Sequence, residues 1–326
     1  MKINPFIISV RDKARAVNCK IAFPDALDER TLLAAQSLVN EKIAQPVLVG
    51  NTEAIQKLAS EKNISLNGIE IVDPLLSDLN DEFAEILFQK RKHKGMTLDA
   101  AAQTIVDPLY YAGLLLETGR VKVVVGGNVS STGDVMRAAI HTVGVKEGIS
   151  IVSSFFIMNW PDKILCFADC AVNPDPTAPQ LADIAISSAV NFSAITGEES
   201  RVAMLSFSTN GSADHPAVDK VKEATAIIHE KAPEIPADGE MQLDAALVSA
   251  IGERKFPGSK VAGNANVLVF PDLNSGNIGY KLTQRLAGAE ATGPIVQGLK
   301  LPYCDLSRGC SVDDMINVAA ICSLMA

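Results

Sequence analysis

The sequence has no long block of basic residues. Its formal net charge is −9 at pH 7, and its pI is near 5.0. Proteins that bind nucleic acids or anionic membrane surfaces need clustered positive charge to contact phosphates, so the composition argues against both classes. A small anionic ligand would need a local basic pocket on this acidic chain.

Long apolar runs are also missing. No stretch reaches the roughly 18 apolar residues that a membrane-spanning helix needs, and the apolar run in residues 5–10 is too short for a signal peptide. We therefore expect a cytoplasmic protein with no membrane partner.

Cysteine and histidine are scarce and scattered. The six cysteines of this 326-residue chain form no disulfide framework, and "CFADC" (residues 166–170), their only close pair, lacks both CxxC spacing and a neighbouring histidine. We interpret them as buried reduced thiols. The four histidines form no ligand pair at helical spacing, so we expect no bound metal.

What the sequence does contain is apolar segments at regular intervals. The length and the 48% hydrophobic content suit two domains with packed cores. From "KIAFPD" (residues 20–25) onward, apolar strands alternate with amphipathic helical segments. This β-α-β pattern predicts an α/β fold with a mostly parallel sheet covered by helices.

A candidate ligand-binding loop follows the apolar strand "VKVVVGG" (residues 121–127). The polar loop after it contains Ser130 and Thr132 and leads into the helical segment "DVMRAAI". Such strand-to-helix junctions are where α/β enzymes bind ligands.

The pattern changes past about residue 145. Residues 148–160 and 162–173 are typical of adjacent strands separated by a Pro-Asp turn, with no helix between them. We interpret this change as the start of a second domain, after which the alternation resumes. The absence of repeats and long linkers predicts two tightly joined domains.

Two polar loops in the second domain share one layout. Small or hydroxylated residues follow a buried strand and precede a helix in "SFSTNGSADHP" (residues 206–216) and "FPDLNSGNIGYK" (residues 270–281). Each is either a polar turn or a cradle for a phosphate or carbonyl oxygen. Because neither matches GxxxxGK[ST] or GxGxxG, NTPase and dehydrogenase functions lose support. The candidate binding residues are Ser206, Ser208, Thr209, Gly211, Asn274, Ser275 and Lys281.

Basic residues gather in "KRKHKG" (residues 90–95) at a predicted helix end, where they oppose the negative pole of the helix dipole. Alternatively, Arg91 or a neighbour contacts an anionic ligand. Arg137 is either a surface or ion-pair residue or, like Arg91, a contact to an anionic ligand.

The stretch "LSRGCSVDD" (residues 306–314) combines two signals. Ser311 followed by Asp314 fits a helix N-cap with an acidic N3 residue. Capping leaves Ser307 and Arg308 unexplained, because an arginine beside a helix N-terminus is unfavourable unless an anion lies between them. We therefore expect both a cap and an anion site.

Together these motifs resemble the phosphate acetyltransferases, which share a superfamily with the phosphate butyryltransferases. The resemblance covers essentially the whole chain in matching order. It rests on "KRKHKG", "SFSTNGSA", "IPADGEMQLDAAL", "FPDLNSGNIGYK" and "GPIVQGLKLPYCDLSRGCSVDD".

The resemblance implies reversible acetyl transfer between acetyl phosphate and coenzyme A, giving acetyl-CoA and inorganic phosphate in a ternary complex. Coenzyme A would be a substrate, with no tightly bound cofactor. The implied fold has two three-layer α/β/α domains, similar to isocitrate and isopropylmalate dehydrogenases, with the active site in the cleft between them. The domains would be residues 1–143 plus 300–326 and residues 144–299, and the assembly a homodimer.

Site roles also follow from the resemblance. Asp314 matches the base that deprotonates the CoA thiol, whose unperturbed pKa of about 8.5 makes it a poor nucleophile near pH 7. Ser307 matches a donor to the developing oxyanion, and Arg308 matches a phosphate ligand. Arg91 and Arg137 match basic residues near the acyl phosphate. Either Cys166 or Cys170 matches a family cysteine near the site, which is no obligatory nucleophile because direct transfer needs no acyl-enzyme.

One departure and two alternatives stay open. Where the family usually has Pro-Val-Asn-Asp-Leu-Ser-Arg, this chain has Tyr303 and Cys304 at the second and third positions, which affects acyl-chain fit or local stability rather than catalysis. One alternative is a phosphate butyryltransferase with a larger acyl pocket. The other is a non-catalytic acetyl-CoA sensing module, like the homologous domain fused to malic enzymes.

Overall fold

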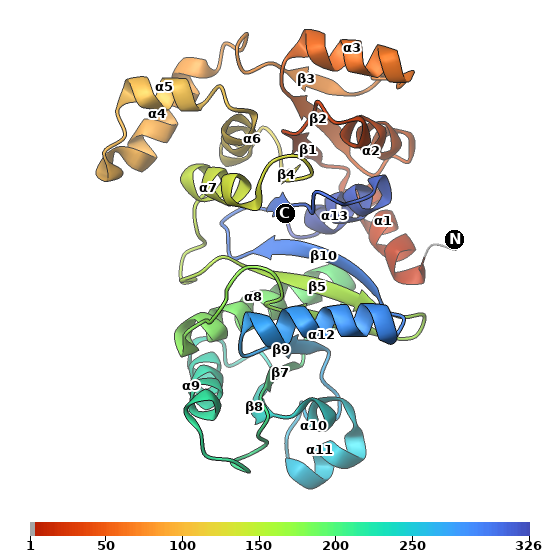
Figure 1. Ribbon diagram of the computed structural model, residues 1–326, viewed down its shortest axis with the longest axis vertical. Helices are drawn as coiled ribbons and strands as arrows, with labels where there is room; N and C mark the ends of the chain where they lie inside the picture. The colour runs from red at the N-terminus through yellow and green to blue at the C-terminus, as the bar shows by residue number, and fades with distance from the viewer. Residues whose placement is uncertain (1–3) are drawn as a thin grey trace.

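The computed structural model describes residues 4–326 as two β-sheets with helices packed on their faces (Figure 1). The first sheet has the order β11-β4-β1-β2-β3, and all of its strand pairs are parallel. Its strands are β1 (Lys20–Phe23), β2 (Gln45–Val49), β3 (Glu70–Val72), β4 (Val123–Gly126) and β11 (Tyr303–Asp305).

Helices cover both faces of this sheet, which explains its continuous apolar strands. The inner strand β4 reads Val-Val-Val-Gly and is buried throughout. Figure 1 shows α6 and α7 on one side of the strands and α2 and α13 on the other. The helical elements of this part of the molecule are α1 (Pro5–Val17), α2 (Glu29–Asn40), α3 (Thr52–Lys62), α4 (Asn80–Arg91), η1 (Lys92–Lys94), α5 (Leu98–Thr104), α6 (Pro108–Glu117), α7 (Thr132–Thr142) and α13 (Val312–Ser323).

The second sheet is mixed, with the order β10-β5-β6-β9-β7-β8. The strand pairs β10–β5 and β5–β6 are antiparallel, and the remaining pairs are parallel. The predicted strand pair around the Pro-Asp turn is therefore confirmed as β5–β6. The strands are β5 (Ser153–Asn159), β6 (Ile164–Ala168), β7 (Val202–Leu205), β8 (Ala237–Met241), β9 (Val267–Val269) and β10 (Glu290–Gln297).

This sheet also lies between layers of helices, so the predicted α/β class with mostly parallel sheets is confirmed. In Figure 1, α12 lies in front of the strands and α8 behind them. The helices of this part are α8 (Ala178–Thr196), α9 (Pro216–Lys231), α10 (Leu243–Leu247), α11 (Ser249–Lys255) and α12 (Leu273–Leu286). In residues 4–326, no helix combines the length and apolar character needed to cross a membrane.

The end of the chain returns to the first sheet. β11 pairs with β4, and α13 packs against α1 and α2, so blue and red segments lie side by side in Figure 1. The strand membership of the two sheets supports the division into residues 1–143 plus 300–326 and residues 144–299, which remains a proposal. This return brings the "LSRGCSVDD" loop beside the loop that follows β4.

Candidate active site

Two strand ends create the candidate site. β4 and β11 are parallel neighbours with Gly126 opposite Asp305, so both chains leave the sheet at the same edge. The loop after β4 enters α7, where Ser131 accepts a hydrogen bond from the Asp134 amide as N-cap. The loop after β11 enters α13 in the same way, capped by Ser311. Two helix N-termini, each favourable for anions, therefore follow adjacent strands.

A pocket of about 550 Å³ opens between these loops and the second sheet. Strand β5 and helix α12 contribute an aromatic wall, in which the rings of Phe156 and Tyr280 stack with centroids 4.2 Å apart. The lining residues are Gly127, Ser130, Ser131, Thr132, Gly133, Phe156, Ala171, Tyr280, Pro294, Asp305, Leu306, Ser307 and Arg308. The structure thus brings together four sequence-predicted residues, namely Ser130, Thr132, Ser307 and Arg308.

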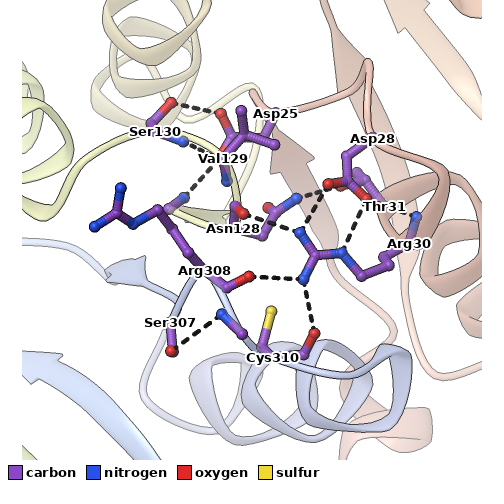
Figure 2. Close-up of polar contacts among 12 residues, drawn as sticks. Asp25, Asp28, Arg30, Thr31, Asn128, Val129, Ser130, Ser307, Arg308 and Cys310 are labelled. Atoms are coloured by element: carbon purple, nitrogen blue, oxygen red, sulfur yellow. Dashed lines mark hydrogen bonds and ion pairs between the residues drawn. The ribbon is translucent and has the colours of Figure 1, made fainter.

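Arg308 supplies a positive charge at this pocket. Its side chain is exposed, and none of the ion pairs within residues 4–326 includes it. Figure 2 shows that the backbone carbonyl of Arg308 points toward Arg30, whereas the guanidinium of Arg308 lies on the opposite side, away from Arg30. An arginine at a pocket without a carboxylate partner is suited to bind an anion such as phosphate.

Arg30 holds the loop that contains Ser307 and Arg308 (Figure 2). Its Nη1 donates hydrogen bonds to the backbone carbonyls of Arg308 and Cys310, both at 2.9 Å. Its Nη2 donates to the carbonyl of Asn128 at 3.0 Å and to the Asp28 carboxylate at 2.8 Å. One planar guanidinium therefore fixes the loops after β4 and β11 relative to each other.

Asp25 organises the loop after β4 in a similar way (Figure 2). Its carboxylate accepts hydrogen bonds from the backbone amides of Gly127 and Val129 and from the Ser130 hydroxyl, the last at 2.5 Å. Because the Ser130 hydroxyl donates to Asp25, it presents lone pairs rather than its proton to the pocket.

Asp314 lies at the third residue of α13, where the predicted cap is confirmed. Its Oδ2 accepts hydrogen bonds from the Ser311 amide and hydroxyl at 2.9 and 2.8 Å, which completes a capping box. The carboxylate is exposed and is outside the set of pocket-lining residues. Burial raises the pKa of Glu290, and the negative charges of Asp314 and Asp313 raise it further. Glu290 is therefore close enough to Asp314 for the two carboxylates to interact.

Arg91 and Arg137 lie near each other at a second cluster outside the set of pocket-lining residues. Burial lowers the pKa of His141, and the positive charges of Arg91 and Arg137 lower it further, so both guanidiniums lie close to this ring. The Tyr110 hydroxyl lies 3.0 Å from His141 Nδ1. Arg137 also forms an exposed ion pair with Asp134 at 2.8 Å. Arg91 belongs to the last turn of α4, as the "KRKHKG" pattern predicted.

The loop after β7 has its hydrogen-bond donors satisfied internally. The Ser208 hydroxyl and the Gly211 amide both donate to Glu240 Oε1 at 2.8 Å, and the Gln242 amide donates to the Thr209 hydroxyl. Ser208 and Thr209 are buried. The Glu240 carboxylate, on the neighbouring strand β8, thus accepts the hydrogen bonds that Ser208 and Gly211 would otherwise donate to a phosphate.

The loop before α12 leads into a helix, as predicted, and the structure shows that the start of this helix is capped. The N-cap is Asp272, which accepts from the Ser275 amide, while Asn274 is exposed beside it. Lys281 is exposed, with its Nζ 5.8 Å from the Tyr280 ring centroid. Only Tyr280 from this segment lines the pocket.

The cysteines near the site are buried thiols. Cys166 and Cys170 are fully buried, and burial raises the pKa of both. Cys170 is followed by the pocket residue Ala171, whereas Cys166 lies within β6. Within residues 4–326, no group of three or more His, Cys, Asp or Glu side chains could hold a metal ion.

Several residues of the site were missed by the sequence analysis. Asp25 lies at the end of the predicted strand segment "KIAFPD", where a carboxylate can accept hydrogen bonds from a neighbouring loop. The position of Asp25 after a strand was therefore a local pattern that could have identified it. Arg30, Asp305, Phe156 and Tyr280 reach the site through pairing of distant segments, for which the single sequence carries no signal.

Comparisons with known proteins agree with this geometry. Residues 5–323 match the family model described as phosphate acetyl/butaryl transferase. A phosphate acetyltransferase of Thermoanaerobacterium thermosaccharolyticum is 47% identical over 98% of this chain and 99% of its own length, and one from Clostridium acetobutylicum is 46% identical over 98% of each. The crystal structure of a phosphotransacetylase from Streptococcus pyogenes superposes with a TM-score of 0.94 at 40% identity, covering 100% of this chain and 99% of the other. The chain therefore belongs to the phosphate acetyl/butaryl transferase family.

Proposed function

We propose that this enzyme is a phosphate acetyltransferase, which transfers an acetyl group reversibly between acetyl phosphate and coenzyme A and releases inorganic phosphate. The full-length similarity to proteins of that name supports acetyl as the acyl group. The observation that carries the proposal is the pocket between the sheets, where Arg308, which forms no ion pair with the residues that the structure describes, lies beside Ser307 and the N-terminus of α7. This arrangement is suited to a phosphoryl group next to a reacting carbonyl.

Arg308 and Ser307 have separate roles in this proposal. Arg308 binds the phosphoryl oxygens and stabilises the charge that grows as phosphate leaves. The exposed Ser307 hydroxyl donates to the oxyanion that forms when sulfur attacks the carbonyl carbon. Ser130 and Thr132 are proposed contacts to the phosphoryl group at the start of α7, and for Ser130 this contact would require its hydroxyl proton to turn from Asp25 to the ligand.

Asp314 is the proposed base for the CoA thiol. Its exposed carboxylate keeps Oδ1 available, because both hydrogen bonds from Ser311 go to Oδ2. The thiolate then attacks directly. The raised pKa of Cys166, Cys170 and Cys310 supports a mechanism without a cysteine acyl-enzyme.

The other predicted residues bind the remaining parts of the substrates. Arg91 and Arg137 form a cationic surface for the approaching anionic substrates. The second-domain residues Ser206, Ser208, Thr209, Gly211, Asn274, Ser275 and Lys281 are proposed CoA contacts. For CoA to contact Ser208 and Gly211, the hydrogen bonds that these two residues donate to Glu240 would have to break.

We also propose a cytoplasmic homodimer. An exposed apolar row on α12 supports the dimer, because Ile278, Leu282 and Leu286 follow each other at helical spacing and are 57%, 53% and 80% exposed. Light scattering at several protein concentrations tests it, and a mass equal to one chain at every concentration would contradict it.

The first experiment follows acetyl-CoA thioester absorbance with acetyl phosphate and CoA, and with butyryl phosphate as the competing substrate. The wild type should prefer acetyl phosphate, and Asp314→Asn should lower kcat by about 10²–10⁴-fold, the usual contribution of a general base. Asp313→Asn is the matched control, since this neighbouring carboxylate pairs with Arg11 and should retain turnover. CoA binding without thioester formation from either acyl phosphate would instead favour the sensing module.

A further inference from the structure

The carboxyl group of Asp305 has an unusual position in the pocket wall. Asp305 is 5% exposed, lines the pocket, and has an Oδ1 atom without a hydrogen-bond partner. Leaving a buried polar atom unpaired is costly, so most native proteins avoid it. Among the described residues with such an atom, Asp305 is the only carboxyl and the only residue that lines this pocket.

This position is fixed by the backbone around it. Asp305 is the last residue of β11 and pairs with Gly126. A Cβ atom at residue 127 would lie 2.0 Å from Oδ1, so only glycine leaves room for the carboxyl at this point. Gly127 also has a φ of 95°, which favours glycine independently. The unpaired oxygen therefore lies closely against residue 127 at the pocket wall.

The charged group that acts on Asp305 is the Asp25 carboxylate, which disfavours the ionised form of Asp305. Asp25, from the loop after β1, adds negative charge, and β4 contributes no ionisable side chain. The pKa of Asp305 is raised to about 6, chiefly by burial and in addition by the charge of Asp25, while a hydrogen bond from the Thr132 side chain on α7 opposes the rise. On the same strand, Tyr303 is fully buried, and burial raises its pKa as well.

Asp25 serves as the internal comparison. It is a buried carboxylate at the same strand edge, but its oxygens accept hydrogen bonds from Gly127, Val129 and Ser130. Asp305 has no such set of donors, and no ion pair of residues 4–326 includes it. In a pocket that attracts anions through Arg308, an ionised Asp305 would repel the ligand, whereas a neutral carboxyl could donate a hydrogen bond to it.

We propose that Asp305, in its protonated form, donates a hydrogen bond to the phosphoryl group in this pocket and passes its proton to the leaving phosphate. This inference rests on the proposed function. The thiol gives its proton to Asp314 and the C–S bond forms. The C–O bond to the phosphoryl group breaks, its electron pair stays on the oxygen, and that oxygen takes the Asp305 proton to give hydrogen phosphate. Asp305 regains a proton from solvent, and Asp314 releases one.

The test measures sulfate binding to the full-length protein by calorimetry between pH 5 and pH 8. Sulfate imitates the phosphoryl group and stays doubly charged throughout, so only the protein titrates. For the wild type, affinity should fall toward tenfold per pH unit above the pKa of Asp305, and binding should take up a proton, detected by repeating the titration in two buffers of different ionisation enthalpy. Asp305→Asn retains an N–H donor but no titrating proton, so its affinity should not vary with pH through this residue.

Asp73→Asn is the matched control. Asp73 is a buried carboxylate that directly follows β3, accepts hydrogen bonds from Asn51 and Thr52, and is outside the pocket. Its variant should therefore keep the wild-type pH dependence. In the thioester assay, Asp305→Asn should lower kcat by about 10²–10⁴-fold, because it lacks a proton to transfer.

Three results would overturn the proposal: no proton uptake by the wild type, an unchanged pH dependence in Asp305→Asn, or no sulfate binding at any pH. The proton-uptake measurement uses the wild type alone and remains decisive even where the variant fails to fold. Failure of the proposed function is a different observation, namely no acetyl-CoA from acetyl phosphate and CoA with the wild type.

Discussion

Two loops of this molecule have similar composition but opposite hydrogen-bonding states. In the loop after β7, Ser208 and Gly211 donate to the buried carboxylate of Glu240. In the loop after β11, Ser307 and Arg308 are exposed at a pocket and have no carboxylate partner in the described chain. Small polar residues after a strand therefore do not make a ligand site by themselves. What matters is whether the protein already uses their donors.

The two buried carboxyl groups beside these loops differ in the same way. Glu240 Oε1 accepts two hydrogen bonds at 2.8 Å, whereas Asp305 Oδ1 accepts none. Glu240 therefore stabilises its loop. Asp305 costs stability and is retained at the pocket, as expected for a group that serves function at the expense of folding.

Among the changes that test this comparison of the two loops, the largest effect is expected from removing the positive charge of the open loop after β11. Arg308→Ala should lower kcat/KM for acetyl phosphate by about 10²–10³-fold, the range measured when a donor to transition-state charge is deleted. Arg254→Ala is the control, because it removes an exposed arginine of α11 outside the pocket. Equal activities of the two variants would show that the open loop is no more functional than the rest of the surface.

The next largest effect is the change that Asp305→Asn should cause in the free energy of unfolding. The folded-state pKa of Asp305 is about 6, against an ordinary value of 3.8, so the folded state holds its proton more tightly and loses stability as pH rises through this range. Asparagine has no charge to bury, so the variant should be more stable than the wild type by about 3 kcal/mol at pH 8 and by less at pH 5. Denaturant unfolding at both pH values measures the difference, and a variant less stable than the wild type at pH 8 would contradict this account.

Glu240→Ala should destabilise the protein, whereas Asp305→Asn should stabilise it. The change leaves the Ser208 hydroxyl and the Gly211 amide without their acceptor, at a cost of about 1–3 kcal/mol. The thermal midpoint should fall by roughly 2–4 °C per kcal/mol for a domain of this size. Glu240→Gln keeps an acceptor oxygen and should lose less. If both variants melt at the wild-type temperature, the second loop is not held by this carboxylate.

Sequence reasoning reached those features that depend on neighbouring residues. The apolar run of β4, the cap of α13 by Ser311 and the basic end of α4 each follow from a few adjacent side chains, and the structure contains all three. The loop after β7 met the same local criteria, but its hydrogen bonds to Glu240 depend on a strand about 30 residues away.

Pairing between distant segments was not predicted from local patterns, although the family resemblance implied that residues 300–326 belong to the first domain. β11 is three residues long and had no strand signal, yet its pairing with β4 positions Asp305 at Gly127. Likewise, Arg30 and the Arg308 carbonyl are 278 positions apart in sequence. Only the return of the chain to its first sheet brings these groups together, and a single sequence does not encode that return in any local pattern.

The smallest predicted effect concerns how the open loop keeps its shape. Arg30 donates from one planar fork to the carbonyls of Arg308, Cys310 and Asn128, and lysine cannot reproduce that geometry. Arg30→Lys should therefore lower kcat/KM by about tenfold, near 1.4 kcal/mol, through misplacement of Arg308. The readout that separates positioning from general instability is a double-mutant cycle, because Arg30→Lys should have little further effect in an Arg308→Ala background. Additive losses would instead mean that Arg30 acts on the fold and not on the loop that binds the phosphoryl group.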